Sequence, residues 1–161
     1  MERMAYSKPP GFPIERGKIH EFADAILDDH LLYHDEGAAK AAGLPSVVAP
    51  PTFSATAAFF PEGGERRGPG LGGMDLRFLL HGGQELVFER PIFAGDVLHA
   101  EPGETRSYEK SGKRGGTMKF VEIETRYRDA KGEIVLRVVN TLIQTAGVVK
   151  DSTTPAGVAV V

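Results

Sequence analysis

An uncharged, apolar helix is the strongest constraint that this sequence places on its fold. Residues 52–60 read TFSATAAFF, and none of these side chains carries a charge. Pro50 and Pro51 come directly before them and suit the first turn of a helix, where the missing amide hydrogens are not needed. A helix that is apolar on nearly every side must be buried on every side. We therefore predict that the rest of the chain wraps this segment.

Two further helices are predicted before the central helix. The first has a single apolar face, formed by Ile19, Phe22, Ala23, Ile26 and Leu27. We expect it to end near Asp28 and Asp29. Asp35 then caps a second helix that runs to Ala42, and Gly43 follows in the stop position.

The second half of the chain has the alternating pattern of β-strands. Residues 117–128 place Val121, Ile123, Thr125 and Tyr127 on one face, and residues 86–92, 97–108 and 134–145 also read as strands. Helices followed by antiparallel strands predict an α+β fold, with one curved antiparallel sheet around the central apolar helix.

The length of the chain fits a single domain over residues 1–161, with loosely ordered tails at 1–11 and 148–161. A net charge of -3 gives no indication of a nucleic-acid or membrane partner. The sequence has no cysteine, no signal-peptide core and no apolar run long enough to span a membrane. We therefore expect a cytoplasmic protein without disulfides or a cysteine nucleophile.

Four titratable residues lie between the two short helices, namely Asp28, Asp29, His30 and His34. One interpretation is that the aspartates end a helix and the histidines are solvated loop residues. The other is proton transfer, for which histidine is suited near neutral pH. Dehydration of a 3-hydroxyacyl thioester needs such groups, together with a donor to the thioester oxygen. The start of the central helix offers the backbone amides of Thr52, Phe53 and Ser54, since both prolines lack an N–H.

The remaining histidines have simpler interpretations. His81 begins a His-Gly-Gly-Gln segment before a predicted strand, and it is either part of a turn or a polar wall of a pocket. His20 and His99 are expected to be structural. No set of His, Asp and Glu residues has a spacing that indicates a metal site, so no metal or other cofactor is predicted.

Four ordered segments resemble the MaoC-like hot-dog dehydratases. They read IHEFADAILDD, LLYHDEGAAKAAGLPSVVAPPTF, LHGGQELVFERPIFAGDVL and NTLIQT. The similarity is greatest to the N-terminal-half branch, which includes non-catalytic-type subunits of (3R)-hydroxyacyl-thioester dehydratases. It implies a hot-dog fold, and pairing of two hot-dog chains with an acyl thioester of coenzyme A or a carrier protein between them.

The resemblance also implies an incomplete catalytic motif. Active members carry Asp-x-Asn-Pro-x-His, and this chain places Asp28, His30, Leu31 and Tyr33 at the Asp, Asn, Pro and His positions. Counted from Asp29 instead, His34 falls at the His position. Ala49-Pro50-Pro51 stands where active members have a His-Gly pair, whose Gly amide binds the thioester oxygen.

These departures predict a subunit of a (3R)-3-hydroxyacyl-thioester dehydratase, or of the reverse R-specific enoyl hydratase. A partner chain would supply the catalytic Asp and His, while Phe53, Phe59, Phe60 and the 61–73 loop shape the acyl tunnel. The alternatives are a self-sufficient homodimer that uses Asp28 or Asp29 with His34, and an acyl-thioester binding module without turnover. A hot-dog thioesterase fits the Ala-rich segment poorly.

Overall fold

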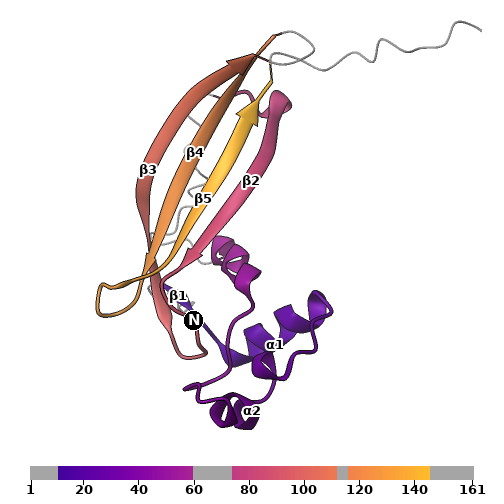
Figure 1. The fold of residues 1–161 in the computed structure, drawn as a ribbon, viewed down its shortest axis with the longest axis vertical. Coiled ribbons are helices and arrows are strands. Elements are labelled where there is room, and N and C mark those ends of the chain that lie inside the picture. Colours follow the sequence, from indigo (N-terminus) through magenta and orange to yellow (C-terminus); the bar gives the residue numbers. More distant parts are fainter. Residues whose placement is uncertain (1–10, 60–73, 112–115, 146–161) are drawn as a thin grey trace, which may run out of the picture.

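A curved antiparallel sheet forms the frame of the protein (Figure 1), in a computed structural model that describes residues 11–59, 74–111 and 116–145. Its strand order is β1-β3-β4-β5-β2, and all neighbouring strands are antiparallel. The strands are β1 (Phe12–Pro13), β2 (Leu79–Phe88), β3 (Val97–Ser111), β4 (Thr117–Arg128) and β5 (Ile134–Gln144). The α+β fold class, with a curved antiparallel sheet, is therefore confirmed.

The helical segments of the described residues all precede the long strands in the sequence. They are α1 (Arg16–Ala25), η1 (Leu31–Tyr33), α2 (Glu36–Ala41), η2 (Pro51–Phe59) and η4 (Leu76–Phe78), where η denotes a 3₁₀ helix. Figure 1 shows α1 and α2 gathered at the end of the sheet where β1 lies, with η2 between them and the long strands. None of the described helices is both long enough and apolar enough to cross a membrane.

The predicted boundaries of α2 are confirmed. The Asp35 carboxylate accepts a hydrogen bond of 2.6 Å from the amide of Ala38 and so caps the helix. Gly43 adopts a φ of 79°, and the amide of Leu44 donates to the carbonyl of Ala39 at 3.0 Å. This left-handed glycine closes the helix end, which only a residue without Cβ does at little cost.

The prediction that Ile26 and Leu27 continue the buried face of the first helix is wrong. α1 ends at Ala25, and Leu27 takes the left-handed conformation with a φ of 59°. The amide of Leu27 donates to Asp24 and that of Asp28 to Ala23, which is the helix-closing pattern normally built on glycine. The reversal turns Leu27 outward, where its side chain is 92% exposed, and Ile26 is exposed as well.

The prediction that the His81–Gln84 segment precedes a strand is also wrong, because these residues lie within β2. The pairing of β2 with β5 shifts by one residue between His81 and Gly83, which forms a β-bulge. A Cβ atom on Gly82 would lie 2.5 Å from the end of the Ile143 side chain, so a larger residue at this position would require that side chain to move. The Gly-Gly pair therefore marks a close approach within the sheet and not a turn.

The central helix is anchored to the core by one aromatic residue. The ring of Phe53 is 2% exposed and packs against Phe12 and Phe22, with ring centroids 5.8 and 5.4 Å away. Strand residues such as Leu136 complete this core. However, Phe59 at the other end of η2 is 65% exposed, so the expectation of burial on every side is not met within one chain.

The predicted tails fall almost entirely outside the described residues. Gly11 is the exception, because it is buried and a Cβ there would touch the Leu98 carbonyl and the Val97 and His99 side chains. The loop predicted over 61–73 also lies outside the described residues.

Candidate functional site

Three of the titratable residues singled out in the sequence, Asp28, Asp29 and His34, line one open hollow beside the C-terminal end of α1. Its volume is about 520 Å³, and it is lined by Asp24, Leu27, Asp28, Asp29, Leu31 and His34. The left-handed turn at Leu27 folds the chain back and thereby brings η1 against the end of α1. The backbone conformation at Leu27 therefore explains why Asp28 and His34 lie close together.

Asp28 and His34 are adjacent, but they do not form a carboxylate–imidazole pair. The His34 Nε2–H donates to the backbone carbonyl oxygen of Asp28 at 2.9 Å. The Asp28 carboxylate instead accepts from the backbone amide of His30 at 3.1 Å. A general base needs its imidazole oriented at the reacting atom with a free acceptor nitrogen, whereas His34 points its other nitrogen at His20, 2.6 Å away.

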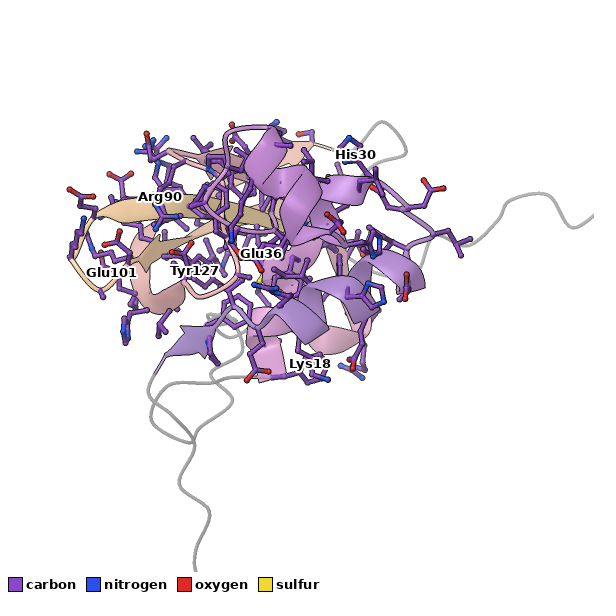
Figure 2. All side chains as sticks on the ribbon, turned by 90° about the horizontal axis from the view of Figure 1, so that it is seen from below. Lys18, His30, Glu36, Arg90, Glu101 and Tyr127 are labelled. Atoms are coloured by element: carbon purple, nitrogen blue, oxygen red, sulfur yellow. The ribbon has the colours of Figure 1, made fainter. Side chains whose placement is uncertain are left out.

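His30 and Tyr33 have local structural contacts. His30 lies at the molecular surface (Figure 2), and its Nδ1 accepts from the amide of Leu32 at 3.3 Å, which caps η1. Tyr33 packs against the main core, and burial, followed by the negative charge of Asp28, raises its pKa above the ordinary value of 10.0. The Tyr33 hydroxyl therefore stays protonated at neutral pH and cannot replace the family histidine as a base.

The start of η2 offers fewer oxyanion donors than its sequence suggests. The amide of Phe53 donates to the Pro50 carbonyl at 2.9 Å, and its ring is enclosed in the core. Ser54 is buried within the 3₁₀ helix, in which each amide donates to the carbonyl three residues before it, so the exposed Thr52 remains the candidate backbone donor. Phe59 is available to contact an acyl chain, while Phe60 lies outside the described residues.

A polar cluster that sequence analysis missed surrounds His81. Gln84 donates to the side-chain oxygen of Asn140 at 3.0 Å, and the His81 Nε2 lies 3.5 Å from the same oxygen. Asn140 lies two residues from the buried Val138 and from the buried Leu142 on β5, so all three side chains are on the same face of the sheet. The cluster therefore lies on the face that carries these core residues. A polar residue within an apolar alternation is the signal that could have identified it.

The fold also brings together His20, Asp24 and His34, although the sequence indicated no metal-ligand spacing. One potential ligand atom from each residue lies within 4.8 Å of the others. The spacing of four residues between His20 and Asp24 on α1 can be read from the sequence. His34, however, lies 14 residues after His20, and only the turn between them brings the two rings together. His20, which was expected to be structural, is exposed, and its ring contacts both His34 and Asp24.

The sequence of this chain matches a known protein family. Residues 4–138 match the model of the FAS1-like dehydratase domain region. A UPF0336 protein of Saccharopolyspora erythraea is 34% identical over 86% of this chain and 85% of its own length. A UPF0336 protein of Streptomyces griseus is 35% identical over 88% of this chain and 90% of its own length.

Solved structures agree with the fold. The chain is similar to a chain of the HadBC (3R-hydroxyacyl-ACP dehydratase) complex of Mycobacterium tuberculosis, with a TM-score of 0.67 and 27% identity over 84% of this chain and 91% of that one. It is also similar in fold to a chain of the ChsH1-ChsH2 complex of the same organism, with a TM-score of 0.64 and 24% identity over 86% of this chain and 87% of that one. The chain therefore belongs to the FAS1-like dehydratase-domain family of MaoC-like hot-dog proteins.

Proposed function

We propose that this chain is a subunit of a (3R)-3-hydroxyacyl-thioester dehydratase, acting in either direction of the reaction, and that it shapes the acyl tunnel. A second MaoC-like chain supplies the catalytic Asp and His. The acyl group is carried as a thioester of coenzyme A or of a carrier protein, and the protein requires no further cofactor.

The observation that carries this proposal is the state of His34. Its imidazole is bonded to the backbone of Asp28 and not to the Asp28 carboxylate. Tyr33, at the position of the family histidine, has a pKa raised above 10.0 by burial, so its hydroxyl already holds its proton at neutral pH and is not a base. General acid–base catalysis contributes about 10²- to 10⁴-fold to rate, and neither the Asp28 carboxylate nor Tyr33 is paired with His34 to provide it.

Exposed apolar residues support the presence of a partner chain. Leu27 and Leu31 project from the hollow, and Phe59 extends from the exposed end of η2. β2 is at one edge of the sheet, with its backbone paired on one side only, to β5. An edge strand that carries exposed apolar side chains of its own, Leu80 and Phe88, suits association with a second hot-dog chain. Two-chain assembly also agrees with the HadBC complex named above.

The test is an activity assay of the purified chain, alone and together with a hot-dog chain that carries Asp-x-Asn-Pro-x-His. Hydration of crotonyl and longer trans-2-enoyl thioesters is followed by the loss of enoyl absorbance. We expect no turnover from the chain alone and turnover from the pair. Replacing the partner's histidine by alanine should lower the rate of the pair by at least about 100-fold.

Matched variants in this chain separate the alternatives. Asp28→Asn and Asp29→Asn change two neighbouring carboxylates of the hollow, and His34→Ala removes the imidazole. Turnover by the chain alone that is lost in His34→Ala and Asp28→Asn, but kept in Asp29→Asn, would establish a self-sufficient homodimer instead. Binding of an acyl thioester without turnover in any mixture would identify a binding module.

A further inference from the structure

Three side chains at the end of α1 have the chemistry and placement of metal ligands. We propose that His20, Asp24 and His34 bind a divalent transition-metal ion of the zinc type. The potential ligand atoms are two imidazole nitrogens and one carboxylate oxygen, all within 4.8 Å of one another. This inference does not depend on the proposed enzymatic function.

The helix places two of the ligands side by side. His20 and Asp24 are separated by one helical turn, and the His20 Nε2 lies 3.4 Å from the Asp24 Oδ2, while the other nitrogen of the same ring, Nδ1, faces His34. An ion would take one of these two nitrogens of His20. The opposite side of α1 is fixed by Ile19 and Ala23, which are fully buried. The exposed side of α1 is therefore a rigid base from which both side chains extend.

His34 is oriented by its own backbone contact. Because a carbonyl oxygen only accepts hydrogen bonds, the bond of 2.9 Å to Asp28 places the proton of the neutral His34 ring on Nε2. The lone pair is then on Nδ1, which faces His20 at 2.6 Å and Asp24 at 4.0 Å. Metal-binding histidines are typically held in this way, with the second nitrogen donating to a carbonyl or carboxylate.

The close contact of the two rings is compatible with a bridging ion. Two nitrogens bound to one tetrahedral zinc ion at its usual bond length lie about 3.3 Å apart. The observed separation of 2.6 Å must therefore widen by roughly 0.7 Å. The His20 side chain is 56% exposed and can move, whereas that of His34 is 16% exposed and stays in place.

The surroundings favour a cation. The described residues that line the hollow include three aspartates, Asp24, Asp28 and Asp29, and no Lys or Arg. Clefts lined by charges of one sign concentrate ions of the opposite sign. Two imidazoles with one carboxylate select zinc, nickel or copper over calcium and magnesium, which prefer oxygen ligands.

The experiment is a calorimetric titration of the chelator-treated full chain with Zn²⁺ at neutral pH. We expect one ion per chain, with affinity falling on acidification because protons compete for the imidazole nitrogens. His20→Ala should weaken binding at least about 10-fold, and Asp24→Asn should weaken it measurably. Proton NMR should show shifts of the ring signals of His20 and His34 on addition of Zn²⁺.

His81→Ala is the matched control, because His81 is an exposed histidine on β2 outside this group. Its affinity for Zn²⁺ should equal that of the unmodified chain. His34→Ala removes a backbone contact as well as a ligand, so the decisive variant is His20→Ala, with circular dichroism to verify its fold. The proposal is overturned if no binding of one ion per chain is seen, or if His20→Ala binds Zn²⁺ as tightly as His81→Ala.

Discussion

Replacing Phe53 by leucine tests whether one aromatic cluster anchors the central helix. The ring of Phe53 is 2% exposed and makes two aromatic contacts, with Phe12 and with Phe22. Each such contact contributes about 0.5–1.5 kcal/mol beyond simple burial. Leucine keeps most of the apolar volume but loses both contacts, so we expect Phe53→Leu to lower the free energy of unfolding by about 1–3 kcal/mol. Full truncation in Phe53→Ala should lower it by about 3–5 kcal/mol.

Urea unfolding followed by far-UV circular dichroism measures these changes. With a slope of about 2 kcal/mol per molar urea, Phe53→Leu should move the midpoint by roughly 0.5–1.5 M. The control is Phe59→Leu in the same helix, where the ring is 65% exposed and the expected loss is below about 1 kcal/mol. Equal midpoints for Phe53→Leu and the unmodified chain would refute the view that this cluster holds the helix in place.

Three further predictions concern stability. Asp35→Ala removes the cap of α2 and should lower the free energy of unfolding by about 1 kcal/mol in urea titrations, whereas Asp35→Ser should restore most of it. Gly82→Ala should be destabilising by about 1–3 kcal/mol because its Cβ would meet the neighbouring strand, and Gly83→Ala, which has open space, should be close to neutral by the same measurement. Burial is the largest influence on the pKa of Asp129 and acts to raise it, but hydrogen bonds from two backbone amides and from Arg90 outweigh burial and lower the pKa below 3.8. Because the pKa of Asp129 is lower in the folded state than in the unfolded state, its stabilisation is complete above pH 3.8 and is lost as the pH falls through the folded-state pKa. In Asp129→Asn, the free energy of unfolding should therefore fall less steeply as the pH is lowered in this range.

Local patterns in the sequence predicted the regular elements well. Apolar–polar alternation gave the bounds of β4 correctly, because its two faces meet different environments and Val121 and Tyr127 are buried. The cap at Asp35 and the stop at Gly43 were also predictable, since each depends on a few neighbouring residues. These signals are local, so tertiary contacts were not needed to interpret them.

The features that sequence analysis missed depend on contacts between distant segments. The Gly82-Gly83 pair reads as a turn, and only its closeness to Ile143 identifies a bulge inside a strand. At the site, the sequence singled out the loop that lines the hollow, but not the partner of each side chain. The contact of His20 with His34 follows from the turn at Leu27, which helical periodicity does not predict.

The conformation of Leu27 bears on how the stability of this protein should be measured. A left-handed residue other than glycine costs about 1–2 kcal/mol, and here the apolar side chain is also fully hydrated. Covering that side chain with another molecule would return about 1.5–3 kcal/mol. In the two-chain assembly proposed above, the melting temperature of the lone polypeptide would therefore be a lower bound for that of the assembly. Leu27→Gly should raise the melting temperature of the lone chain and lower that of the assembly.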